Sequence, residues 1–169
     1  AIAEIAREAG VSRPTVYAYF PSSDAALSGV VARVRDEVRR IQDEADTASV
    51  EAMYRSTLVA MLDLQVRHVG LFALLSAEAR LDERVSRLWH EIFDQPVRRH
   101  ARFIDRLVDA GGARPVASSL VVAEAMNGVT ARFAQLIVED DGRREELAAE
   151  LVAIQQCLLG ISEEAPPHR

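Results

Sequence analysis

The chain lacks several features that would place it outside the cell or in a membrane. Among its 169 residues, Cys157 is the only cysteine, so no disulfide can form within the chain. No apolar run approaches the roughly 20 residues that a membrane-spanning helix needs, and no signal peptide is recognisable. A soluble, cytoplasmic protein is therefore expected.

Groups that carry catalysis or hold cofactors are also scarce. The sequence has no glycine-rich phosphate loop, and Cys157 has no neighbouring signature of a nucleophile. His68, His90 and His100 lack the short spacing that would bring metal ligands onto one helix face. The sequence therefore predicts no enzyme activity, no metal site and no cofactor.

Apolar residues occur in abundance, but at the spacing of helices. They make up 49% of the chain, and no stretch alternates with the period of a strand. We expect an all-α protein, large enough for one domain or for a small domain fused to a larger one. The expected helices are Ile2 to about Ala9, about Arg13 to Phe20, Asp24 to about Ala45, Val50 to an interruption at Gly70, Leu71 to Ala79, a segment after Asp82 that Pro96 kinks or divides and Gly111 closes, Pro115 to about Glu139, and Arg143 to about Leu159.

The first two of these helices are joined by a very short turn. Gly10 stands where a chain leaving a helix often needs a positive φ. Ser12 can cap the next helix, and Pro14 falls in its first turn, where a missing N–H costs nothing. This pattern is typical of a helix-turn-helix, whose second helix enters the major groove of DNA.

The second helix has an inner and an outer face. Helical spacing turns Val16 and Phe20 inward together with Val11, and it leaves Arg13 and Tyr17 on the outer surface. An arginine can donate to a guanine edge, and Pro14 can touch a thymine methyl group.

The stretch IAEIAREAGVSRPTVYAYFPSSDAAL resembles the DNA-binding segment of the TetR family of bacterial transcriptional regulators, whose conserved run corresponds to Ala9–Phe20. The resemblance covers about the first sixth of the chain. It implies that Thr15, Tyr17 and Tyr19 contact phosphates, which set register more than sequence choice. The expected DNA-binding residues are Ser12, Arg13, Pro14, Thr15, Tyr17, Tyr19, Ser22 and Ser23.

Two departures weaken the resemblance. The family usually has lysine at the position of Ser23 and leucine at that of Ala26, and this chain has no lysine at all.

Six arginines and five acidic residues leave the first 40 residues with a net charge of only +1. Because the family has a helix before this motif, we also expect that the N-terminus of the sequence is trimmed or disordered.

The resemblance further implies a domain order: a helix-turn-helix segment at 1–28, a helical ligand-binding and dimerisation domain at 29–162, and a flexible tail at 163–169. In the family the last two helices pair with those of a second copy as a four-helix bundle. Burial of this hairpin in the core of its own chain is the alternative. The expected interface residues are Ala123, Asn127, Ala131, Leu147, Leu151, Ile154 and Leu158.

Polar or aromatic residues within apolar helix faces indicate a small-molecule pocket. The expected ligand-binding residues are Thr57, Met61, Gln65, His68, Trp89, Phe93 and His100. The alternative is that His68 and His100 belong to the core or its rim.

The leading hypothesis is a homodimeric, ligand-responsive transcriptional regulator, a repressor that a small, largely apolar effector releases from palindromic operator DNA. The rival hypothesis is a small-molecule-binding or interaction protein of the same fold that does not bind an operator.

Overall fold

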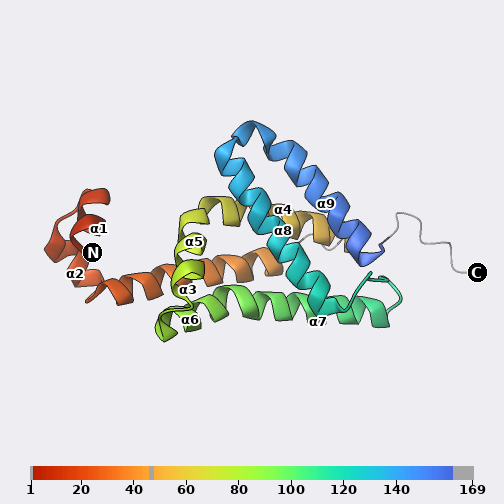
Figure 1. Cartoon of the computed structure of the whole chain (residues 1–169), viewed down its shortest axis with the longest axis horizontal. Helices are drawn as coiled ribbons and strands as arrows, with labels where there is room; N and C mark the ends of the chain where they lie inside the picture. The colour runs from red at the N-terminus through yellow and green to blue at the C-terminus, as the bar shows by residue number, and fades with distance from the viewer. Residues whose placement is uncertain (1, 46–47, 162–169) are drawn as a thin grey trace, which may run out of the picture. The chain divides into compact units, whose positions relative to one another are not determined.

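The computed structural model describes residues 2–45 and 48–161, and these contain helices but no strand, which confirms the all-α class (Figure 1). The tail expected at 163–169 lies outside the described residues. The elements are α1 (Ile2–Glu8), α2 (Arg13–Tyr19), α3 (Ser23–Asp43), α4 (Val50–Arg67), α5 (Val69–Glu78), α6 (Glu83–Trp89), the π-helical η1 (His90–Asp94), α7 (Gln95–Asp109), α8 (Ser119–Glu139), the 3₁₀-helical η2 (Asp141–Arg143) and α9 (Arg144–Leu159). The chain forms two compact units, Ala1–Glu37 and Val38–Arg169, and the boundary falls within α3.

The first unit contains the helix-turn-helix. Gly10 has a φ of 65°, and the Ser12 side chain caps α2 by accepting a hydrogen bond from Thr15 N at 3.2 Å, so the predicted turn chemistry is confirmed. Ala6 and Val16 are buried against each other, with Phe20 packed beside them. This small core fixes the angle between α1 and α2.

Two residues show how closely this unit is packed. A Cβ atom on Gly29 of α3 would lie 3.0 Å from Phe20 Cε1, so the absence of a side chain leaves room for the ring. Val11, by contrast, is 43% exposed, and its predicted inward orientation is wrong. Its N–H donates to Ala6 O at 3.0 Å and closes the turn, which holds the residue at the surface.

The second unit is built around α8. This helix packs on α4, α7 and α9, and Figure 1 shows α8 and α9 as an antiparallel hairpin joined through η2. The residues that form the centre of the core, Leu62, Ile104, Ile137, Leu151 and Leu159, are at most 1% exposed.

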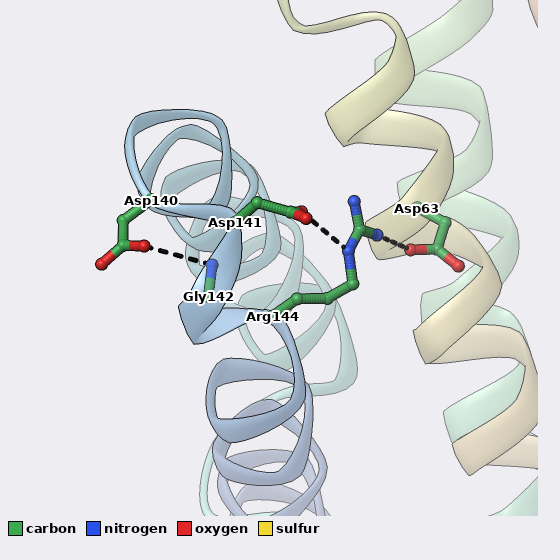
Figure 2. A network of polar contacts seen from close by, with 5 residues as sticks. All are labelled: Asp63, Asp140, Asp141, Gly142 and Arg144. Carbon is green, nitrogen blue, oxygen red and sulfur yellow. Dashed lines mark hydrogen bonds and ion pairs between the residues drawn. The ribbon is translucent and has the colours of Figure 1, made fainter.

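A polar network fastens the hairpin corner to α4 (Figure 2). Arg144 donates from Nη1 to Asp63 Oδ1 at 2.5 Å and from Nε to Asp141 Oδ1 at 3.1 Å. Asp140 Oδ1 accepts from Gly142 N at 3.1 Å within η2. The side chains of Arg144 and Asp63 are 40% and 41% exposed, so the pair contributes at most about 1 kcal/mol and chiefly orients the corner.

The break between α4 and α5 falls at His68, two residues before the expected interruption at Gly70, which lies within α5. The two helices meet at a bend of 75°. Within the described residues no single helix is long and apolar enough to cross a membrane; this bent pair is the only candidate, by length and composition alone.

Pro96 divides its segment as predicted, and the division takes the form of the π-helical turn η1 immediately before α7. Proline lacks the N–H that would continue an α-helical hydrogen-bond pattern. The N–H of Gln95, the residue before it, donates to His90 O, five residues back, as in a π-helix.

The helix expected from Pro115 begins at Ser119 instead, which corrects the prediction. Arg114 N donates to Leu159 O at 2.9 Å, and Val116 N donates to Leu158 O at 3.0 Å. The segment around Pro115 therefore satisfies the free carbonyls at the end of α9 and cannot form a helical turn of its own.

Candidate functional site

The first candidate site is the outer face of α2. Tyr17 is 54% and Tyr19 is 77% exposed, and Arg13, which makes no ion pair with any described residue, is exposed beside them. The eight residues predicted to bind DNA are all exposed. The face therefore presents a guanidinium and two phenol hydroxyls to solvent.

Several hydroxyl groups on this face also hold the helix ends. Ser12 Oγ and Thr15 Oγ1 lie 2.7 Å apart, and Ser22 Oγ accepts from Ala25 N at 3.1 Å at the start of α3. Ser12 and Ser22 thus act first as caps, which positions Arg13 and Tyr17 on a rigid helix.

The second candidate site is a cavity of about 360 Å³ within the second unit. Its walls come from α4, α7 and α8, with the end of α3 and Gln155 of α9 completing them. The volume is in the range of small-molecule sites. Four of the seven predicted ligand-binding residues line the cavity: Thr57, Met61, Gln65 and His100.

The other three predicted residues lie elsewhere. The Trp89 and Phe93 rings stack with centroids 4.0 Å apart, Phe93 meets Phe72 edge-on at 5.1 Å, and Phe72 meets His68 at 6.5 Å. This aromatic row runs from the α4–α5 bend to the α6–η1 segment, and none of its members lines the cavity. Aromatic residues in an apolar stripe here pack against one another.

Other lining residues were not predicted. Tyr54 belongs to the α4 stripe that carries Thr57 and Gln65, so its spacing was a usable signal. Phe103, Met126 and Asn127 also line the cavity, although Asn127 was assigned to a dimer interface. It accepts from Gln65 Nε2 at 3.4 Å, a contact between distant helices that no local pattern predicts.

Two polar atoms of the cavity residues are buried without a hydrogen-bond partner among the described residues, Tyr54 Oη and His100 Nε2. The two rings are neighbours, with centroids 5.7 Å apart. Burial raises the pKa of the Tyr54 hydroxyl and lowers the pKa of His100 to about 4. Both side chains are therefore uncharged at neutral pH.

The buried imidazole has a measurable consequence for stability. Below pH 6.5 an unfolded chain protonates its histidine, whereas the folded chain keeps His100 neutral down to about pH 4. The unfolded state then binds more protons, so stability falls as the pH drops through this window. Lowering the pH from 7 to 5 should cost the wild-type protein on the order of 2 kcal/mol more than it costs His100→Gln.

Urea unfolding of both proteins at the two pH values measures this difference. The same substitution at His90, whose side chain is 50% exposed, shows whether the effect belongs to the buried ring. An identical pH response of His100→Gln and wild type would contradict a neutral, buried His100.

Three of the seven residues predicted for a dimer interface are internal. Ala123, Leu147 and Leu151 are 1%, 3% and 0% exposed in the core of their own chain. Asn127, Ala131, Ile154 and Leu158 are half-buried. The outward faces of α8 and α9 carry other residues, among them Val121, Ala125, Gly128, Ala149 and Ala153.

Within residues 2–45 and 48–161, no group of three or more His, Cys, Asp or Glu side chains is arranged to hold a metal ion.

Comparison with known proteins supports the assignment of the first site. Residues 1–27 match the family described as bacterial regulatory proteins, tetR family. The chain is 28% identical over 129 residues to the HTH-type transcriptional regulator EthR of Mycobacterium tuberculosis, covering 73% of this chain and 59% of that protein. It is 23% identical over 146 residues to the nucleoid occlusion factor SlmA of Aliivibrio fischeri, covering 82% of this chain and 73% of that protein.

The fold is shared with a solved TetR-family structure from Mesorhizobium loti. The two superpose with a TM-score of 0.64 at 18% identity, over 93% of this chain and 85% of the other. The matched helix-turn-helix, the relatives and the shared fold together support the TetR family of bacterial transcriptional regulators as the family of this chain.

Proposed function

We propose that this regulator is a repressor, acting in the cytoplasm as a homodimer that binds palindromic operator DNA and is released by a small, largely apolar effector. The observation that carries the proposal is the outer face of α2, with Arg13, Tyr17 and Tyr19 exposed on a capped helix. Arginine is the commonest reader of guanine, and exposed hydroxyls suit phosphates. EthR is named as a transcriptional regulator, which agrees with this use of the motif.

A homodimer is proposed because one seven-residue recognition helix reads too few bases to select an operator. Helix-turn-helix dimers read two half-sites whose centres are about 34–36 Å apart. The outward faces of α8 and α9 support such an assembly. Small exposed residues, Ala125, Gly128, Ala149 and Ala153, allow helices of two copies to approach closely, and Val121 adds apolar surface.

The effector is proposed to act through α3. Gln42 and Asp43, at the end of this helix, line the cavity, and Arg99 Nη1 of α7 donates to Gln42 Oε1 at 2.6 Å. Because α3 begins directly after the recognition helix, a ligand that moves its end can change the operator-binding state. Ligand and DNA must then weaken each other by the same factor.

Transcript measurement in the native bacterium tests the repressor role. Deleting the gene should raise the transcript of a neighbouring gene, and restoring the wild-type gene should lower it again. Restoring Arg13→Ala should leave the transcript high, whereas restoring Arg87→Ala, which removes an exposed arginine from α6, should behave as wild type. A transcript that falls on deletion would indicate an activator, and no change in any neighbouring transcript would favour a ligand-binding protein of this fold without operator function.

A further inference from the structure

The charged side chains of the cavity belong to its exposed residues. Three of the residues that line it are charged, Asp43, Arg99 and Arg106, and all three are exposed. The buried residues of its wall are apolar or uncharged, among them Leu58, Met126, Gln65 and Thr130. A charged group among these buried residues would lose its hydration without gaining a counter-ion. The charged end of a ligand therefore belongs beside the exposed residues, and an apolar body suits the interior.

Arg106 is the cation that is open to such a ligand. Its Cζ atom lies 5.3 Å from the centroid of the Phe103 ring, which also lines the cavity, so a cation–π contact holds the guanidinium against the cavity wall. Arg106 makes no ion pair with a described residue. Arg99, the other arginine, already donates from Nη1 to Gln42 Oε1 at 2.6 Å. The guanidinium of Arg106 is therefore free to pair with an anion.

The charge of Arg106 acts on a buried residue of the cavity, whereas that of Asp43 does not. Burial raises the pKa of the Tyr54 hydroxyl, and the positive charge of Arg106 partly offsets this rise. Burial alone lowers the pKa of His100 to about 4, although a carboxylate close to the ring would raise it. The electrostatic influence on the cavity wall is therefore positive, which favours an anionic ligand over a cationic one.

We propose that the cavity binds an amphipathic monocarboxylate, whose carboxylate pairs with Arg106 and whose apolar body lies against Leu58, Met61 and Phe103. A guanidinium can donate two parallel N–H···O bonds to one carboxylate. A single free guanidinium, with Asp43 lining the same cavity, suits one negative charge better than the two of a phosphate group. The volume of about 360 Å³ limits the ligand to roughly a dozen non-hydrogen atoms. This assignment rests on the proposed function of the cavity as the effector site.

Three probes with a phenyl ring and a four-carbon chain test the charge of the ligand: phenylbutanoate, phenylbutanamide and phenylbutylamine. Calorimetric titration of the full-length protein at neutral pH and low salt, without DNA, should show phenylbutanoate binding at least about fivefold more tightly than either of the others. Arg106→Gln should abolish this preference and change phenylbutanamide binding by less than about twofold. Added salt should weaken phenylbutanoate binding to the wild type more than to this variant.

Arg102→Gln is the matched control. It removes an exposed arginine one turn earlier on α7 that does not line the cavity, and it should leave the preference intact. Phenylbutanamide binding reports that each variant retains a folded cavity. The proposal is overturned if the amide or the amine binds as tightly as the carboxylate, if Arg106→Gln and Arg102→Gln have equal effects, or if none of the three probes binds at millimolar concentration.

The absence of DNA keeps these titrations separate from the operator experiments. A protein that binds its operator and prefers the amine remains a regulator, with a ligand class that overturns this assignment. Phenylbutanoate that binds as expected but leaves operator affinity unchanged would support the site and contradict release by the effector.

Discussion

Arg13→Ala should lower the affinity of the full-length protein for its operator by at least about thirtyfold and relax base preference at one position of each half-site. A guanidinium that reads a guanine edge contributes about 1–3 kcal/mol, and a homodimer loses two of them. Arg13 is exposed and makes no ion pair with a described residue. Its removal should therefore leave the stability of the protein almost unchanged, so that the loss is in DNA binding. Fluorescence anisotropy with labelled operator and with single-base variants measures both effects.

Two further variants distinguish base-specific contacts from the general electrostatic attraction between the protein and DNA. Arg87→Ala removes the same charge from α6, far along the chain from the recognition helix, and should change affinity by less than about twofold. Tyr17→Phe removes an exposed hydroxyl expected on a phosphate and should weaken all duplexes alike. Equal losses for Arg13→Ala and Arg87→Ala would show that α2 does not read bases.

Gly160→Ala should destabilise the second unit by at least about 3 kcal/mol, which corresponds to a fall in melting temperature of roughly 6–12 °C. Gly160 ends α9 with a φ of 59°, and a Cβ atom there would lie 2.3 Å from Arg114 O. The backbone of Arg114 is fixed by the hydrogen bond from its N–H to Leu159 O at 2.9 Å. It therefore cannot move away without breaking this hydrogen bond to the C-terminal end of α9. The left-handed backbone itself disfavours alanine by about 1–2 kcal/mol.

Gly111→Ala is the matched control for this variant. Gly111 also has a positive φ, 73°, but nothing lies within 4 Å of a Cβ atom there. It should lose only about 1 kcal/mol, the backbone cost alone. Thermal unfolding followed by circular dichroism compares the two, and equal losses would show that the 114–116 segment does not hold the end of α9.

The helix-turn-helix could be predicted from sequence because its determinants are local. Gly10, Ser12 and Pro14 act on their immediate neighbours, and Val16 needs only helical spacing to face inward. Val11 was misplaced because a residue in a turn follows the path of the backbone, not the period of either helix.

The second unit was predictable only in part, because its details depend on contacts between distant segments. α8 begins at Ser119 and not at the predicted Pro115, because backbone N–H groups around Pro115 donate to carbonyls at the end of α9. Gln65 and His100 were found as polar residues on apolar stripes, whereas Trp89 and Phe93 carry the same signal but stack on each other. Periodicity identifies the face of a helix, and only the packed structure shows what that face meets.

Selection of bound duplexes from a random library by the full-length protein tests the central claim, that α2 of a dimer reads an operator. The expected product is an inverted repeat with half-site centres about one helical turn, or a multiple of it, apart. Its affinity should exceed that of random duplex by at least about a thousandfold at physiological salt. An enriched pool without a symmetric motif, bound no better than random duplex at every salt concentration, would contradict the account.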